Sequence, residues 1–245
     1  MAEVYDNDVF FAEYSTMDRS MKGLDGAPEW PQYQALLPKL HGLNVLDLGC
    51  GLGWFSRWAM DQGAKSSRGI DNSHNMLAQA KEMTDHDGIT YEHANLDQIS
   101  FGEDSKNKYD LDHSSLVLHY LVNLDDLAKQ VHNVLVPGGT FSFCIEHPII
   151  TSTYHQNCIV DDKTGKTFWS LSYYPDEGTR KIRWLNGDVE KQHRMTATYM
   201  NVLLKNGFEV TGFDEWFAPR DVLASFGRNR VREMPMFLLV SAIKK

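Results

Sequence analysis

The chain has 245 residues, of which 42% are hydrophobic and 23% charged, and its formal net charge is −9. The length and composition suit one soluble α/β domain with an insertion, and the negative charge disfavours a nucleic-acid partner, which would select clusters of Lys and Arg. No apolar run approaches the roughly eighteen residues of a membrane span, and the acidic N-terminus lacks the basic start of a signal peptide. We therefore expect a cytoplasmic protein with neither a nucleic-acid nor a membrane partner.

The candidate metal ligands of the chain do not follow a metal-binding pattern. The three cysteines are an odd number and contain no Cys-x-x-Cys pair, which argues against a disulfide framework or a cysteine-bound metal. Glu146, His147 and His193 are conceivable ligands, but no His-x-x-x-His or His-Glu-x-x-His spacing supports them. We therefore expect no metal site.

Two helices are predicted before the first strand, within residues 1–43. Apolar side chains recur at helical spacing in residues 10–17 and in residues 30–37, and a turn rich in Gly and Pro separates them at residues 23–28.

A glycine-rich turn after the first predicted strand is the most informative feature of the chain. An apolar run at residues 45–48 predicts a buried strand, and Gly49, Gly51 and Gly53 then precede a predicted helix. Glycines let the backbone turn tightly and let a ligand approach the main chain, and free N–H groups at a helix start favour an electron-rich ligand. The next apolar segment ends at Asp71, and an acid at the end of a second strand can accept both hydroxyls of a ribose. The sequence therefore predicts a nucleoside-binding βαβ unit.

The spacing of these glycines indicates which nucleoside is bound. A dinucleotide fingerprint has Gly-x-Gly-x-x-Gly, in which the third glycine allows close packing of helix and strand. This chain instead has Gly-x-Gly-x-Gly followed by the bulky Trp54. The pattern resembles motif I of the class I S-adenosylmethionine-dependent methyltransferases, and Trp54 argues against the rival class, the nicotinamide-dependent oxidoreductases.

Later segments resemble the other motifs of that family in the same order. The family's third strand and its turn match residues 89–96, and its fourth strand and the following loop match residues 109–120. The Pro-Gly-Gly turn and the fifth strand match residues 134–143. The last helix and the sixth strand match residues 203–210, and the seventh strand matches residues 235–242. The resemblance covers roughly residues 40–146 and 193–245. It implies an α/β, Rossmann-like seven-stranded mixed sheet with helices on both faces.

The resemblance also implies how the single domain is divided. Residues 1–43 would form an N-terminal helical cover that closes the site, and residues 44–146 the cofactor-binding half. An insertion follows the fifth strand at residues 147–192, and residues 193–245 would supply the last helix and strands six and seven.

The cofactor implied by the resemblance is S-adenosyl-L-methionine. In the family the glycine turn approaches the cofactor, the acid before it positions the methionine moiety, the acid after the second strand takes the ribose, and an acid or amide after the third strand takes the adenine. Carried onto this chain, the expected cofactor-binding residues are Tyr14, Arg19, Asp47, Gly49, Gly51, Gly53, Asp71, Asn72, Met76, Asn95, Leu96 and Ser114.

Residues 147–192 interrupt the alternation of strands and helices. The segment mixes several aromatic residues with Gly, Asp and Lys, and alternation at residues 167–174 and 181–185 predicts short strands. An insertion after the fifth strand lies over the carboxyl ends of the strands, where open α/β sheets bind ligands. We interpret it as a substrate lid; the alternative is an irregular surface excursion whose aromatic residues form a small core of their own.

Three residues are expected on the acceptor side of the site. His119 could be a general base, a substrate hydrogen-bonding group or a structural histidine, while Glu146 and His147 end the fifth strand, where they could meet a substrate. Asp112 and His113 depart from the family, because the fourth strand should be apolar on both faces. A buried Asp112 needs a donor, for which His113 or a neighbouring helix could serve.

The sequence therefore predicts an S-adenosylmethionine-dependent methyltransferase that transfers a methyl group in line to O, N or C of a small, partly apolar molecule. The Glu-His-Pro-Ile that starts at Glu146 is similar to a subgroup of small-molecule methyltransferases. The alternative is a protein of the same fold that binds the cofactor without transferring its methyl group, either a cyclase-like catalyst or a regulatory binding module. We expect a monomer or a homodimer.

Overall fold

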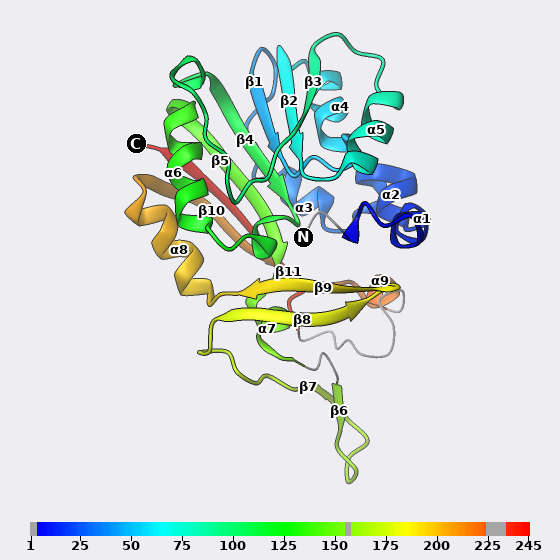
Figure 1. Ribbon diagram of the computed structural model, residues 1–245. Helices are drawn as coiled ribbons and strands as arrows, with labels where there is room; N and C mark the ends of the chain where they lie inside the picture. The colour runs from blue at the N-terminus through cyan, green and yellow to red at the C-terminus, as the bar shows by residue number, and fades with distance from the viewer. Residues whose placement is uncertain (1–3, 155–157, 224–233) are drawn as a thin grey trace.

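The computed structural model describes residues 4–154, 158–223 and 234–245. Its centre is a seven-stranded sheet in the order β10-β11-β5-β4-β1-β2-β3 (Figure 1). Strands β1 to β5 run parallel, whereas β11 runs antiparallel to both β5 and β10, so the predicted Rossmann-like mixed sheet is confirmed. The strands are β1 (Asn44–Leu48), β2 (Ser66–Asp71), β3 (Ile89–His93), β4 (Tyr109–Ser115), β5 (Leu135–Glu146), β10 (Phe208–Trp216) and β11 (Phe237–Lys244).

Helices cover both faces of this sheet because its central strands bury side chains on both sides. The main helices are α4 (Trp54–Asp61), α5 (His74–Glu82), α6 (Leu124–Val134) and α8 (Thr196–Lys205). Leu46 packs with the apolar residues of α6 and α8 in one buried cluster, and its neighbour Val45 packs with those of α4 in another. The alternation of side chains along a strand separates the two clusters.

The fourth strand contains the two polar residues that depart from the family pattern, and their expected pairing is wrong. Successive residues of a strand point to opposite faces, so His113 cannot reach the carboxylate of Asp112. Its Nδ1 lies 2.9 Å from Oδ1 of Asp47 instead. Asp112 is fully buried, and neither of its carboxylate oxygens has a hydrogen-bond partner among the described residues. Burial, together with the charge of Asp47, raises the pKa of Asp112 well above its usual value.

The N-terminal segment folds into short helices beside the sheet. They are α1 (Asp8–Ser15), α2 (Asp18–Lys22), the 3₁₀ helix η2 (Gly23–Gly26) and α3 (Trp30–Gln34). Asn7 caps α1, because its Oδ1 accepts hydrogen bonds from the N–H groups of Val9 and Phe10. The two predicted helices are present, and α2 between them was not expected.

Trp54 attaches this N-terminal segment to the sheet. Its indole Nε1 donates to the carbonyl oxygen of Ser20 over 3.2 Å. Gly23 lies against the indole ring with φ of +61°, and a Cβ there would come within 2.4 Å of the ring. Trp54 stands where a dinucleotide fingerprint would have its third glycine. Its indole instead packs against α2 and η2.

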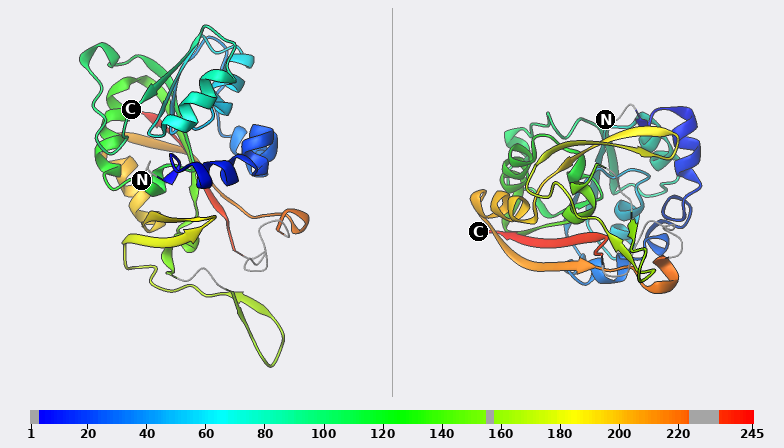
Figure 2. Two further views of the ribbon diagram at one scale, coloured as in Figure 1. Left: turned by 45° about the vertical axis from the view of Figure 1, so that its right-hand side comes forward. Right: turned by 90° about the horizontal axis from the view of Figure 1, so that it is seen from below.

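The insertion after β5 consists of one short helix and two hairpins. Its elements are α7 (Pro148–Ser152), β6 (Cys158–Val160), β7 (Thr167–Trp169), β8 (Gly178–Trp184) and β9 (Gly187–His193). The β8–β9 hairpin lies across the end of the sheet, whereas the β6–β7 hairpin projects away from the body (Figures 1 and 2). The predicted short strands are present, but only the second hairpin is placed to cover a site.

The remaining helices are η3 (Glu103–Ser105), η4 (Leu118–Tyr120) and α9 (Arg220–Leu223). No helix among the described residues is both long and apolar enough to cross a membrane. The same residues contain no group of three His, Cys, Asp or Glu side chains that could hold a metal ion.

Candidate active site

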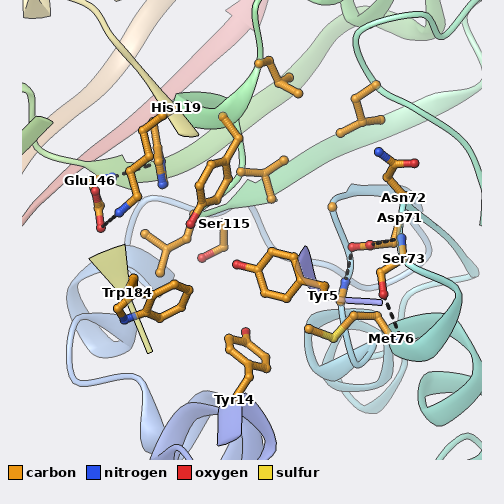
Figure 3. Close-up of a pocket in the computed structure, with 18 of the residues that line it drawn as sticks. Tyr5, Tyr14, Asp71, Asn72, Ser73, Met76, Ser115, His119, Glu146 and Trp184 are labelled. Atoms are coloured by element: carbon orange, nitrogen blue, oxygen red, sulfur yellow. Dashed lines mark hydrogen bonds and ion pairs between the residues drawn. The ribbon is translucent and has the colours of Figure 1, made fainter. Parts of the chain in front are cut away.

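A cavity of about 400 Å³ opens at the carboxyl ends of the parallel strands. Its walls come from the glycine turn after β1, the end of β2, the segment after β3, the η4 region, the end of β5, the N-terminal segment and the β8–β9 hairpin. In Figure 3, Asp71, Asn72, Ser73 and Met76 form one side, His119 and Glu146 the other, and Tyr5 and Ser115 lie between. We call these sides the nucleoside half and the acceptor half.

The nucleoside half is built on the glycine turn and on Asp71. Gly49 and Gly51 have positive φ angles of +75° and +51°. A Cβ at Gly51 would meet no atom within 4 Å, so its backbone borders open space. Oδ2 of Asp71 accepts the N–H of Gly51 over 2.8 Å, and Oδ1 accepts the N–H of Ser73 over 2.9 Å. Each carboxylate oxygen keeps a further acceptor position for a ligand hydroxyl.

Two opposing effects act on the pKa of Asp71. Burial raises the pKa of its carboxyl group, and the hydrogen bonds from backbone N–H groups oppose this rise. Ser73 completes the wall: it caps α5 by accepting the N–H of Met76 at its Oγ over 3.2 Å.

Four further residues predicted to bind the cofactor line this half. Asn72, Met76, Asn95 and Leu96 all border the cavity. The Oδ1 of Asn95 accepts the N–H of Asp97 over 3.0 Å, which orients its side-chain amide.

The N-terminal segment contributes an arginine and two tyrosines to the cavity wall. Nη2 of Arg19 lies 3.0 and 2.8 Å from the two carboxylate oxygens of the buried Glu29. Tyr14, which was predicted, and Tyr5, which was not, line the cavity with their rings 5.3 Å apart in an edge-to-face arrangement. Burial raises the pKa of both phenols, so each is a neutral hydroxyl at physiological pH.

The acceptor half contains a buried ion pair. Lys191 of β9 is 4% exposed, and its Nζ lies 2.6 Å from Oε1 of Glu146 at the end of β5. The Nζ lies 5.8 Å from the ring centroid of Tyr120 and 5.9 Å from that of Trp184, and both rings border the cavity. A charged pair with aromatic neighbours therefore faces the ligand space.

His119 lies beside this pair, and its tautomer is fixed by the backbone. Its Nδ1 accepts the N–H of Glu146 over 3.3 Å, so the proton of the neutral ring is on Nε2. Burial lowers the pKa of His119 to about 3, with Lys191 and Arg194 contributing in the same direction against the charge of Glu146. Of the three expected roles, this geometry favours a hydrogen-bond donor over a general base.

Two polar residues predicted to contact the cofactor do not line the cavity. Asp47 is buried, and its Oδ2 accepts the hydroxyl of Ser56 over 2.8 Å while its Oδ1 pairs with His113. The Ser114 hydroxyl donates to the carbonyl oxygen of Leu48 over 2.9 Å, inside the sheet. Its neighbour Ser115 borders the cavity instead, because side chains alternate along β4.

Gly53 and His147 also lie outside the cavity lining, and the structure gives each a local role. Gly53 precedes α4 with φ of +72°, and a Cβ there would come within 2.1 Å of the Tyr91 hydroxyl. His147 caps α7 by accepting the N–H of Ile149 at Nδ1, and its Nε2 lies 2.8 Å from Oε1 of Glu215. Sequence reasoning had read them as a cofactor contact and a substrate contact.

Several residues of the cavity wall were not selected from the sequence, among them Tyr5, Ser115, Tyr120, Trp184 and Lys191. Tyr5 and Lys191 carry no local motif, and Tyr120 was seen only as a neighbour of His119. Ser115 could have been preferred to Ser114 had the phase of β4 been known, and Trp184 was noted only among the aromatic residues of the insertion.

Known proteins share this fold and much of this sequence. A family model described as a methyltransferase domain matches residues 46–143. The crystal structure of an S-adenosylmethionine-dependent methyltransferase from Mesorhizobium loti is 42% identical, with a TM-score of 0.82, over 91% of this chain and 100% of that one. The chain belongs to the S-adenosylmethionine-dependent methyltransferases. Its cofactor is S-adenosylmethionine, and the prediction of class I methyltransferase is confirmed.

Two further proteins are similar to this methyltransferase over most of its length. A structure described as a putative S-adenosylmethionine-dependent methyltransferase from Listeria monocytogenes is 36% identical, with a TM-score of 0.79, over 89% of this chain and 99% of that one. An uncharacterized protein of Haemophilus influenzae is 31% identical over 218 residues, which are 86% of this chain and 85% of the relative. The assignment overturns the nicotinamide-dependent alternative and leaves the acceptor unnamed.

Proposed function

We propose that the methyltransferase binds S-adenosylmethionine in the nucleoside half of the cavity and transfers its methyl group to a small, partly apolar acceptor in the acceptor half. The residues of the nucleoside half fit this cofactor. Gly51 leaves backbone open to a ligand, and Asp71 has acceptor positions for the ribose hydroxyls. Asn72, Met76, Asn95 and Leu96 would surround the adenine, and Tyr14 and Arg19 the methionine moiety.

The cofactor supplies the activated methyl group, and the protein has to hold the reacting atoms in line and exclude water. Tyr5 and Ser115 would stand where the two ligands meet, because they lie between the two halves (Figure 3). His119 would donate its Nε2–H to the acceptor.

The main support for the proposal is that a single cavity has two chemically different halves. The cavity has the volume of a small-molecule site, which lies in the range of about 300–1,000 Å³. The β8–β9 hairpin supplies Ile182, Trp184 and Lys191 to the acceptor half, so the insertion acts as a substrate lid. This covering favours a small acceptor over a folded macromolecule.

A labelled-methyl assay tests the proposal. The enzyme is incubated with S-adenosylmethionine that carries a radiolabelled methyl group and with pools of small phenols, carboxylic acids and amines. We expect label in a low-mass product and an equal amount of S-adenosylhomocysteine. Transfer only to protein or nucleic acid would contradict a small acceptor, and binding without consumption in every pool would favour the alternative of a protein that does not transfer methyl.

A further inference from the structure

The Glu146–Lys191 pair does more than tie the insertion to the sheet. The same hairpin carries a second lysine–glutamate pair, Lys181 and Glu190, whose charged atoms lie 2.8 Å apart on the surface. The side chain of Lys181 is 75% exposed, whereas that of Lys191 is 5% exposed and borders the cavity. Burying an ammonium group is costly even when it is paired, so a lysine inside the ligand space is expected to act on the ligand.

The surroundings of Lys191 define what it could hold. Tyr120 and Trp184 provide aromatic surfaces on two sides of the ammonium group, and His119 presents an N–H donor from the same half. Burial raises the pKa of Tyr120, so its hydroxyl stays protonated. Among the described residues, Glu146 from β5 pairs with Lys191, and Arg194 from the segment after β9 adds a positive charge near His119. Lys191 and His119 thus offer hydrogen-bond donors to the ligand space, which suits an acceptor rich in lone pairs.

Of the described residues in the acceptor half, neither His119 nor Glu146 is arranged as a general base. His119 carries its proton on Nε2 and its other nitrogen accepts a backbone N–H, and the Glu146 carboxylate is held by Lys191. An oxygen nucleophile would have to be in its anionic form before it meets the cofactor.

Resting on the proposed function, we propose that Lys191 binds the nucleophilic oxygen of the acceptor as an oxyanion, in the form of a phenolate, an enolate or a carboxylate. The acceptor loses its proton to water on binding, and the ammonium group stabilises the charge that remains. In the transfer step the oxyanion forms an O–C bond to the methyl carbon, and the C–S bond breaks with its electron pair going to sulfur. The negative oxygen and the positive sulfur become a neutral ether or ester and a neutral thioether.

The test measures ionisation of a coloured probe in the enzyme loaded with S-adenosylhomocysteine. The probe is 4-nitrophenol, whose phenolate absorbs visible light. We expect its pKa to fall by about one unit on binding, because an opposite charge within about 4–6 Å lowers an acid's pKa by one to three units. 4-Nitrobenzoate tests the carboxylate form, and 4-nitrobenzyl alcohol is a control of similar shape that does not ionise.

A pair of double variants isolates the contribution of Lys191. Lys191→Met with Glu146→Gln removes both charges together, so that no unpaired charge is left buried. We expect this variant to bind S-adenosylhomocysteine as before and to lose the pKa shift. Lys181→Met with Glu190→Gln removes the exposed pair of the same hairpin and should leave the shift unchanged.

Each outcome decides the inference. A shift that requires Lys191 supports it, and binding of 4-nitrophenol alone or 4-nitrobenzoate alone tells which oxyanion the site takes. It is overturned if the probe binds as the neutral phenol, if the shift survives in the Lys191 double variant, if the alcohol binds as tightly as the anions, or if neither acid binds. Failure of the native enzyme to bind S-adenosylhomocysteine would contradict the proposed function instead.

Discussion

Asp112 is a carboxylic acid in the interior of the sheet, and its effect on stability depends on pH. Its side chain is buried from solvent. This burial, together with the negative charge of Asp47, raises its pKa in the folded protein well above the ordinary value of 3.8. The folded state therefore keeps the proton over a pH range in which the unfolded chain has lost it. Over that range the free energy of unfolding falls as pH rises.

We predict that Asp112→Asn, which cannot ionise, becomes more stable than the native protein as pH rises above about 4. The difference should grow by about 1.4 kcal/mol per pH unit until the folded pKa is reached. Urea unfolding at several pH values measures it, with the exposed Asp104→Asn as control. A difference that does not change with pH would show that Asp112 is not buried as the neutral acid.

At the level of single residues, the sequence predicted backbone-defined positions better than side-chain contacts. Gly49, Gly51 and Asp71 line the cavity because a turn and a strand end fix their places. Ser115 lines the cavity in place of the predicted Ser114, because the phase of β4 is set by its pairing with β1 and β5 and has no signal in the local sequence. Lys191 reaches the cavity through a hairpin whose placement is a tertiary feature, so no local pattern marked it.

At the level of elements, Asp6 connects the N-terminal segment to the nucleoside half of the cavity. Oδ1 of Asp6 accepts the Ser73 hydroxyl over 2.6 Å and the N–H of Asn75 over 3.1 Å, at the start of α5. Burial opposes ionisation of Asp6, but these hydrogen bonds outweigh it and lower its pKa. Because Tyr5 lies in the cavity wall next to Asp6, we expect this contact to hold the wall in place over a bound ligand.

We predict that Asp6→Ala weakens the binding of S-adenosylhomocysteine by up to about thirtyfold, mainly through faster dissociation, since two hydrogen bonds worth about 1 kcal/mol each are lost. Stopped-flow displacement measures the rate. Asp8→Ala, which changes an exposed acid two residues later, is the matched control. Equal dissociation rates in the two variants would mean that the contact does not close the site.

A buried arginine, Arg180, connects several parts of the insertion. Arg180 donates to the carbonyl oxygens of Ser152, Tyr173 and Asp176, and its guanidinium lies 4.4 Å from the ring centroid of Tyr154. The planar fork of donors connects α7, the segment before β8 and β8 itself, which a lysine cannot do.

We predict that Arg180→Lys lowers the free energy of unfolding by about 2 kcal/mol, because several hydrogen bonds to buried carbonyl groups are lost. Hydrogen exchange should increase first in the β8–β9 hairpin. Lys181→Arg, at an exposed position of the same strand, is the control. Unchanged exchange in the hairpin would show that other contacts hold the insertion.

The elements themselves followed from the sequence with few exceptions. The first strands of the sheet were predicted from apolar runs, the later ones from the resemblance to the family, and the short strands of the insertion from alternation. The outward direction of the β6–β7 hairpin and the packing of α2 on Trp54 depend on contacts between distant segments, and were not predicted.

At the level of the whole molecule, two segments outside the sheet complete the cavity that the sheet begins. The N-terminal segment supplies Tyr5, Tyr14 and Arg19, and the insertion supplies Trp184 and Lys191. The glycine turn and Asp71 come from the sheet, whereas each half of the cavity is completed by an added segment: Tyr14 and Arg19 beside the nucleoside half, and Trp184 and Lys191 in the acceptor half. Loss of either added segment should impair transfer more than folding of the sheet.

A calorimetric titration with S-adenosylhomocysteine tests the central claim most directly, comparing the native enzyme with Asp71→Ala. We predict that the native enzyme binds it and does not bind NAD, and that the affinity of the variant falls roughly thirtyfold, because charge-assisted hydrogen bonds to the ribose contribute about 2 kcal/mol or more. Asp61→Ala, an exposed change at the end of α4, should bind normally. Equal affinity of a folded Asp71→Ala variant and the native enzyme would contradict the account.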